Sequence, residues 1–162
     1  MSRLGKQQID EATRMQNDLS RKICVHQEAN DRKASVENPG GTILFYLQEW
    51  EREFGNPEQP KFPWAFYRAD GCQMGIEYPG DDDPGAPMMK SRIWMSNFDL
   101  SGMELRCKQP LALAPATHKH KHALGTMSIN GVKGIGVANF SGKYVGPQSS
   151  IYAKAVARAC EK

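Results

Sequence analysis

The hydrophobic residues near the start of the chain recur with a helical period. No Gly or Pro occurs from residue 6 to residue 38, and Asn38-Pro39-Gly40-Gly41 would end a helix. The spacing predicts a helix over residues 6–34. Its apolar positions form only a thin stripe, which is typical of an extended arm, a coiled-coil strand or a peripheral helix. The stripe consists of Ile9, Ala12, Met15, Leu19 and Ile23.

A second helix is predicted over residues 42–54. Thr42 can serve as its N-cap, and Gly55 can end it. Apolar residues lie on one face at intervals of four, three and four, namely Ile43, Leu47, Trp50 and Phe54. An alternative interpretation makes residues 42–47 a buried strand, but the longer helical period favours the helix.

From residue 62 the apolar period changes to two, which predicts strands. Residues 64–69 and 72–78 flank Asp70-Gly71, a dipeptide that favours a hairpin turn. Asn130-Gly131 predicts a second hairpin. Apolar residues at helical spacing after residue 149 predict a final helix that packs on the sheet. The remaining predicted strands cover residues 92–98, 103–108, 118–129 and 132–140.

Together these elements predict an α+β fold. It has N-terminal helices, an antiparallel meander sheet of five to six strands, and a C-terminal helix packed on the sheet. We expect residues 1–38 to form a helical arm and residues 39–162 to form a single α+β domain. The pattern leaves open whether the sheet is open or closed into a barrel.

The composition agrees with a globular protein. Of 162 residues, 40% are hydrophobic and 24% are charged, and no apolar run approaches the roughly 20 residues of a membrane helix. The first residues show no apolar leader. Four cysteines occur without a Cys-x-x-Cys pair, so we expect free thiols. We therefore expect a cytoplasmic, reducing location and no membrane partner.

Charge is distributed unevenly along the chain. The net charge is +3, yet residues 36–60 carry one basic and five acidic residues, and residues 101–162 carry nine basic and two acidic. If the basic side chains share one sheet face, that face would bind nucleic acid or an acidic protein surface. Alternatively, the acidic and basic parts face each other, or the charges are simply solvated. The candidate nucleic-acid-binding residues are Arg106, Lys108, Lys119, Lys121, Lys133 and Lys143.

A histidine-rich segment offers a second kind of chemistry. On a strand, His118, His120 and His122 would point to one face, and Cys107 could supply a fourth ligand. Such a set would suit zinc. The alternative is an exposed edge strand protected by its lysines. We expect no obligatory cofactor, with zinc as the one alternative.

Residues suited to catalysis are not evident. No nucleophile elbow or convincing carboxylate pair occurs, so no catalytic residue is predicted and the sequence favours a non-enzymatic role. Asp81-Asp82-Asp83 lacks the full calcium-loop pattern and is expected to be a solvated loop, or a loop that docks on a basic partner.

Three functional hypotheses follow from these observations. The first is a small binding protein whose basic C-terminal sheet contacts nucleic acid. The alternative is a protein–protein interaction module, such as a viral or mobile-element inhibitor or an assembly factor, with a possible homodimer through the N-terminal helix. The third is a metal-dependent hydrolase that uses His118, His120 and His122.

Overall fold

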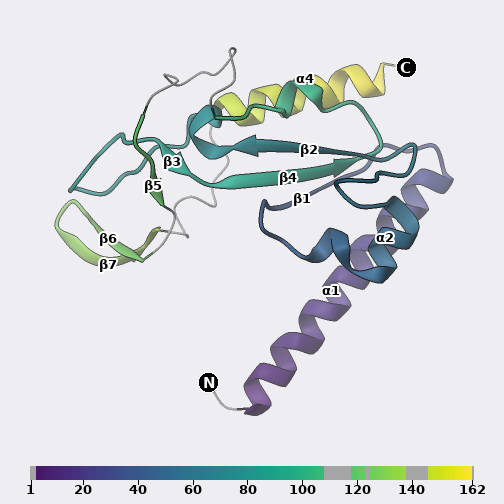
Figure 1. Cartoon of the computed structure of the whole chain (residues 1–162), viewed down its shortest axis with the longest axis horizontal. Helices are drawn as coiled ribbons and strands as arrows, with labels where there is room; N and C mark the ends of the chain where they lie inside the picture. The colour runs from purple at the N-terminus through teal and green to yellow at the C-terminus, as the bar shows by residue number, and fades with distance from the viewer. Residues whose placement is uncertain (1–2, 108–117, 123–124, 138–145, 162) are drawn as a thin grey trace.

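The computed structural model describes residues 3–107, 118–122, 125–137 and 146–161 and has a mixed α+β fold, which confirms the predicted class. Its elements follow one another along the chain as shown in Figure 1. In order they are α1 (Arg3–Ala29), β1 (Ser35–Pro39), the 3-10 turn η1 (Leu44–Tyr46), α2 (Gln48–Phe54), β2 (Ala65–Asp70), the 3-10 turn η2 (Gly71–Met74), β3 (Met88–Met89), β4 (Ser91–Ser96), the 3-10 turn η3 (Ser101–Met103), β5 (Lys121–His122), β6 (Thr126–Ile129), β7 (Val132–Gly136) and α4 (Gly146–Cys160).

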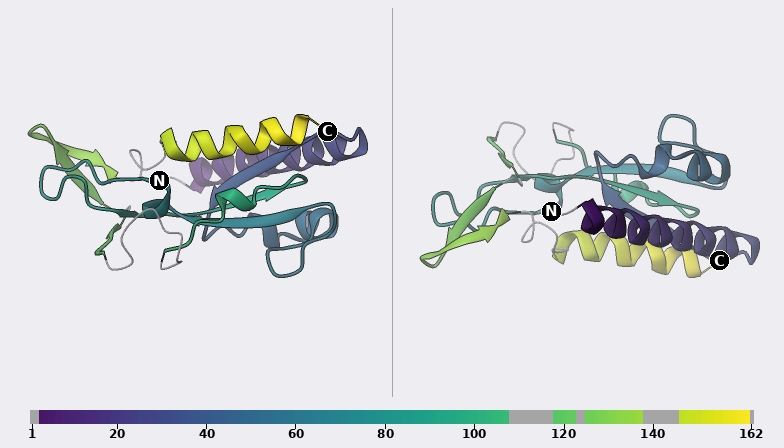
Figure 2. Two further views of the ribbon diagram at one scale, coloured as in Figure 1. Left: turned by 90° about the horizontal axis from the view of Figure 1, so that it is seen from above. Right: turned by 90° about the horizontal axis from the view of Figure 1, so that it is seen from below.

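A three-stranded antiparallel sheet forms the centre of the fold. Its strand order is β1-β4-β2, so the central strand β4 pairs with both neighbours. Side chains alternate along β4: Trp94 packs with Met103 of η3 and Ala155 of α4, while Ile93 and Met95 pack with the core beside α2. Figure 2 accordingly shows α4 on one side of the sheet and α2 on the other.

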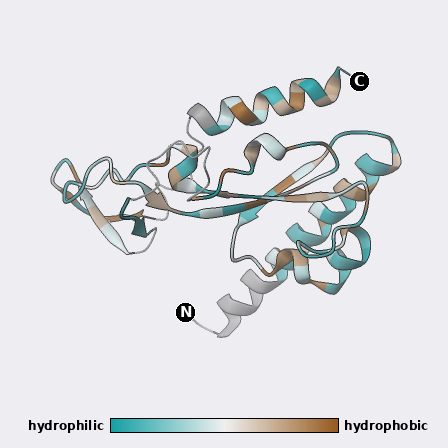
Figure 3. Cartoon of the chain, turned by 45° about the horizontal axis from the view of Figure 1, so that its top comes forward, coloured by the Kyte–Doolittle hydropathy of each residue, from teal (hydrophilic) through white to brown (hydrophobic). Residues whose placement is uncertain are grey.

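The core beneath α2 is largely aromatic. Phe45, Trp50, Phe54 and Trp64 are all buried, and neighbouring ring centroids lie 4.7–5.7 Å apart in tilted or edge-on arrangements. Such contacts add to the burial energy of each ring. In Figure 3 hydrophobic and hydrophilic residues alternate along α4, whereas hydrophilic residues dominate α2 and the coloured part of α1.

The predicted single meander is wrong in its connectivity. The described strands divide into the three-stranded sheet, a parallel β3–β5 pair and a β6–β7 hairpin. Asp70-Gly71 does not form a hairpin turn, because β2 continues into η2 and pairs with β4. At Gly71 an added Cβ would lie 2.9 Å from the carbonyl oxygen of Lys90, so this close backbone approach requires glycine.

The helix boundaries also differ from the prediction. Helix α1 ends at Ala29, five residues before the predicted end at residue 34, and Ser35–Pro39 forms the edge strand β1. The expected helix over residues 42–54 is split into η1 and α2 by Leu47, whose backbone is extended. A strand was predicted over residues 103–108, but residues 103–107 form none: the 3-10 turn η3 ends at Met103, and the chain is irregular from there to Cys107.

Two local predictions are confirmed. Asn130 and Gly131 have φ angles of 51° and 78°, as the two central residues of a type I′ hairpin turn require, and Ile129 lies opposite Val132. The final helix is present as α4, and its Ala155 is buried against the sheet.

Residues 138–140 of the last predicted strand lie outside the described residues. In the described part of the chain, no helix is both long and apolar enough to cross a membrane.

Candidate metal centre

Two cysteines and two histidines meet at one point of the fold. The ligand atoms of Cys72, Cys107, His118 and His120 all lie within 4.8 Å of one another. They come from three segments: η2, the chain after η3, and the residues that lead into β5. Two thiolates with two imidazoles form the donor set that zinc prefers in structural sites.

Cys72 reaches the site because the chain turns sharply at the end of β2. Gly71 donates its backbone N–H to the carbonyl of Lys90 at 2.8 Å, and Gly75 ends η2 in the left-handed conformation with φ 77°. The thiol of Cys72 is buried, and the Gln73 side-chain amide approaches its Sγ at 3.7 Å. The tight turn therefore holds one ligand inside the fold.

Asp70 fixes the segment that carries Cys107. Its backbone N–H donates to the carbonyl of Leu105 at 2.9 Å, and its Oδ2 accepts the backbone N–H of Cys107 at 2.8 Å. The same carboxylate accepts from Nε of Arg106 at 3.2 Å and from Oγ of Ser91 at 3.2 Å. Asp70 is almost fully buried. Asp70 therefore fixes the backbone of Cys107, and it would serve as an outer-shell partner if these four donors held an ion.

The histidine segment is held from its opposite face. Lys121 donates to Oδ2 of Asp82 at 2.9 Å, lies 3.5 Å from Oδ2 of Asp83, and stands 5.1 Å from the centre of the Tyr78 ring. The backbone N–H of Lys121 also bonds to the carbonyl of Pro87 at 3.0 Å. These contacts hold the residue that follows His120.

The distances between donors are close to those of a tetrahedral zinc site. Nε2 of His120 lies 3.3 Å from Sγ of Cys72 and 3.5 Å from Sγ of Cys107, and Nε2 of His118 lies 3.8 Å from Sγ of Cys107. Normal zinc bond lengths give a sulfur–nitrogen edge of about 3.6 Å. The two Nε2 atoms are 2.8 Å apart, against a tetrahedral edge of about 3.4 Å, a difference that a small ring rotation would correct.

The electrostatics of this four-residue cluster also suit a cation. Burial, followed by the nearby Cys107 thiol, raises the pKa of the Cys72 thiol to about 11. A buried thiolate at Cys72 beside a second, half-buried thiolate at Cys107 would be costly without a compensating positive charge. A divalent ion with two thiolates and two neutral imidazoles is neutral overall, so this donor set can bind such an ion inside the protein.

The structure brings together only part of the predicted histidine set. His118 and His120 belong to the cluster, whereas His122 is exposed, pairs with Met89, and is not part of it. Cys107 is close to both histidines, as the sequence suggested. Cys72 was predicted only as an alternating strand residue, and no local motif marks it as a ligand because 34 residues separate it from Cys107.

The predicted basic residues occupy different surroundings. Arg106 is paired with Asp70, and Lys121 is paired with Asp82 and Asp83. Lys119 and Lys133 are exposed. Lys108 and Lys143 lie outside the described residues. Of the four basic residues that can be placed, two therefore already have acidic partners within the chain.

The acidic loop contacts the chain itself. The Asp81 carboxylate accepts the backbone N–H groups of Asn130 and Gly131 at 2.9 and 3.0 Å, which secures the β6–β7 turn. Asp82 accepts hydrogen bonds from the Tyr78 hydroxyl at 2.8 Å and from Lys121. The loop thus accepts hydrogen bonds from backbone and side-chain donors of the C-terminal third. These contacts agree with the alternative interpretation of the charge pattern, in which acidic and basic parts of the chain face each other.

Comparison with known proteins identifies no relative: no family model, curated protein or solved structure matches this chain.

Proposed function

We propose that this chain is a zinc-binding protein in which Cys72, Cys107, His118 and His120 hold one structural ion. The observation that carries this proposal is the convergence of four donors from segments distant in sequence at mutual distances that suit tetrahedral zinc. The outer shell supports it as well, since Asp70 holds the Cys107 backbone. No other set of three or more possible metal ligands occurs among the described residues.

A structural role fits this site better than the hydrolase hypothesis. Catalytic zinc sites use three protein ligands and keep a position for water or substrate, whereas structural sites use four. Here four protein donors would complete the coordination sphere of a tetrahedral ion and leave no position for water or substrate. The ion would link the end of β2, the chain after η3 and the approach to β5. Because structural zinc binding contributes about 10–16 kcal/mol in small domains, its removal should loosen these segments strongly.

The experiment that tests the proposal is metal analysis of the full chain purified without chelators. We expect one zinc per chain. Replacement by Co²⁺ should give thiolate-to-cobalt charge-transfer bands and the intense visible bands of a tetrahedral ion. His120→Ala and Cys107→Ser should each abolish stoichiometric binding and this spectrum.

Matched controls are available within the same chain. His122→Ala removes an imidazole two residues from His120, and Cys160→Ser removes an exposed thiol, so both should retain one zinc and the tetrahedral spectrum. A wild-type chain that binds no stoichiometric metal and shows no tetrahedral cobalt spectrum would contradict the proposal. Equal losses in His122→Ala and His120→Ala would also contradict it.

Contact with nucleic acid is the second candidate function, and it now depends on fewer residues. Lys119 lies between His118 and His120 in the sequence and is exposed. If both histidines bind an ion, the Lys119 ammonium group remains available to solvent beside the site. Lys133 is exposed on β7. We expect salt-dependent retention of DNA or RNA that Lys119→Glu and Lys133→Glu weaken. Absence of binding at about 50 mM salt would exclude this role without affecting the zinc proposal.

A further inference from the structure

The apolar stripe of α1 faces away from the rest of the protein. Met15, Leu19 and Ile23 expose 69%, 59% and 48% of their surface, and Ala12 is also exposed. At 100° per residue these four positions lie within about 80° of one another on the helix surface. An amphipathic helix normally turns such a face toward the core.

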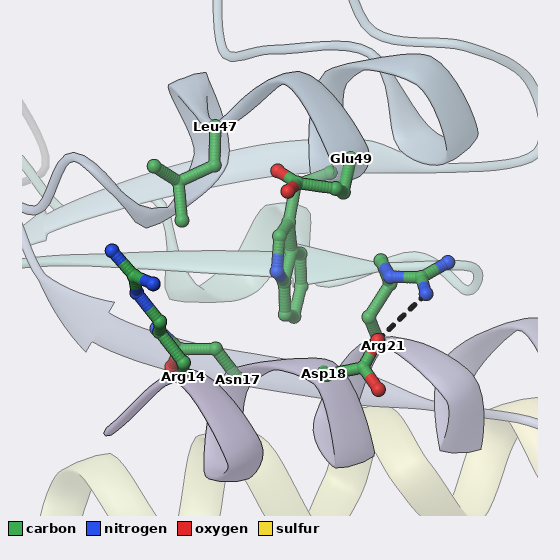
Figure 4. A pocket seen from close by; sticks show the side chains of 7 residues that line it. Arg14, Asn17, Asp18, Arg21, Leu47 and Glu49 are labelled. Atoms are coloured by element: carbon green, nitrogen blue, oxygen red, sulfur yellow. Dashed lines mark hydrogen bonds and ion pairs between the residues drawn. The ribbon is translucent and has the colours of Figure 1, made fainter. Parts of the chain in front are cut away.

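The opposite face of α1 makes the contacts with the body. Cys24 is buried, Glu28 accepts a hydrogen bond from the Trp64 indole at 2.7 Å, and Arg21 lies 3.5 Å from Glu53. In Figure 4 the side chains of Arg14 and Asn17 from this side of α1 stand opposite α2, and Arg21 and Asp18 are paired beside them. The polar face of the helix is thus the one that is partnered inside the chain. Figure 1 shows α1 running away from the sheet, so nothing in the described chain covers its outer face.

The charges beside the stripe indicate what covers it. Glu11, Asp18 and Lys22 lie on the same flank of the apolar face, where Lys22 also pairs with Asp18 of its own helix at 2.6 Å. The other flank carries uncharged Gln16, Ser20 and Gln27. When two copies of a helix pair antiparallel, equal flanks meet, whereas in a parallel pair opposite flanks meet. Only the antiparallel arrangement therefore brings Glu11 of one copy near Lys22 of the other.

One antiparallel register satisfies the apolar and charged positions together. Setting Met15 against Leu19 of a second copy also sets the small Ala12 against the large Ile23, and Glu11 against Lys22. By symmetry each of these pairs occurs twice. We propose that the outer face of α1 binds a second copy of this chain as an antiparallel helix pair, independently of the metal centre.

The dimer should be weak. The face offers four exposed apolar residues, against roughly 20–30 residues a side in a standard interface, so we expect a reversible dimer with a Kd on the order of 10 μM. The charged pairs are exposed and serve mainly to select the orientation.

The test is sedimentation equilibrium of the full chain from about 1 to 300 μM. We expect a monomer–dimer equilibrium in the wild type and a monomer throughout for Leu19→Glu. Because Leu19 is exposed in the single chain, this variant should keep the wild-type circular dichroism spectrum and metal content. Glu11→Lys and Lys22→Glu should each weaken the dimer several-fold, and the double variant should restore it, because the exchanged charges again meet as opposites.

Each of three results would overturn the proposal. A wild-type chain that stays monomeric over the whole range excludes self-association and assigns the face to a different protein. A dimer that persists in Leu19→Glu places the contact elsewhere. A double charge exchange that dimerises no better than either single variant rejects the antiparallel register. All three readouts are independent of zinc, so failure here leaves the proposed function untouched.

Discussion

Replacement of Asp70 tests whether the proposed metal centre depends on its outer shell. In the wild type this buried carboxylate accepts hydrogen bonds from the backbone of Cys107, from Arg106 and from Ser91. Asp70→Ala removes all three. Hydrogen bonds to a charged group contribute about 1.5–3 kcal/mol each, and the Arg106 contact counts less because its side chain is 40% exposed. We therefore expect Asp70→Ala to lower the free energy of unfolding by about 3–5 kcal/mol.

Asp70→Asn separates geometry from charge. The asparagine oxygen can still accept from the Cys107 N–H and from Arg106, and its NH₂ can donate to the Ser91 hydroxyl, which is able to accept. Only the charge-dependent part of the interactions is lost, so we expect a cost of about 1 kcal/mol. Outer-shell changes that release a ligand typically weaken metal binding 10- to 100-fold. We expect a loss of that size in Asp70→Ala and one below about threefold in Asp70→Asn.

The assays are urea denaturation at fixed free zinc and competition for zinc with a chromophoric chelator. A tenfold weaker Kd lowers the apparent stability by about 1.4 kcal/mol when zinc is in excess, so the two measurements check each other. Glu104→Ala is the matched control, because it removes an exposed carboxylate from the same segment and should change stability by less than about 0.5 kcal/mol. A zinc Kd for Asp70→Ala within twofold of the wild type would refute the reasoning. So would an equal loss in Asp70→Asn.

Two further predictions concern the acidic loop and the thiols. Asp81→Ala should lower the free energy of unfolding by about 1–2 kcal/mol in a urea titration, because the Asp81 carboxylate accepts two backbone N–H groups of the β6–β7 turn. Asp83→Ala should lower it by less than about 0.5 kcal/mol, because the Asp83 carboxylate makes only an exposed ion pair with Lys121. Equal effects of the two changes would contradict this assignment. A thiol reagent should modify only the exposed Cys160 rapidly in the zinc-loaded protein and should also reach Cys107 after chelation, while Cys24, whose pKa burial raises to about 11, should react only on unfolding. Rapid modification of Cys107 with zinc bound would contradict the assignment of its thiol to the site.

Predictions from the sequence succeeded where structure is set by neighbouring residues. Asn130-Gly131 forms its hairpin turn because both residues tolerate positive φ, and the apolar spacing of the last segment produced α4. Asp70-Gly71 carries nearly the same local signal but leads into η2. There the decisive contact is the approach of Gly71 to the carbonyls of Lys90 and Met88, which are distant in sequence. Tertiary contact therefore overrode a local turn preference.

The helix α1 shows the limit of periodicity as evidence. The apolar spacing correctly predicted a helix, yet the stripe that defined it faces solvent while Cys24 and Glu28 contact the body. Periodicity reports that a helix has an apolar face, and it does not report which surface covers that face. Strand β1 lies beyond the predicted helix and was not predicted, because Ser35–Pro39 acquires its structure by pairing with β4.

The proposed metal centre combines a local sequence signal with one that is not local. Alternation around His118 and His120 places two imidazoles together, which a reader of the sequence can derive. The partner thiols belong to segments that only the folded backbone brings near. One of them is fixed by hydrogen bonds between Asp70 and the Cys107 segment, in which the Asp70 carboxylate accepts the Cys107 N–H and the Asp70 N–H donates to the Leu105 carbonyl. The neighbouring Lys121 is bound by Asp82 and Asp83, so the same short segment is restrained on both faces. The acidic loop at residues 81–83 thus holds one basic residue of the last third, Lys121, beside the position where the histidines face the cysteines.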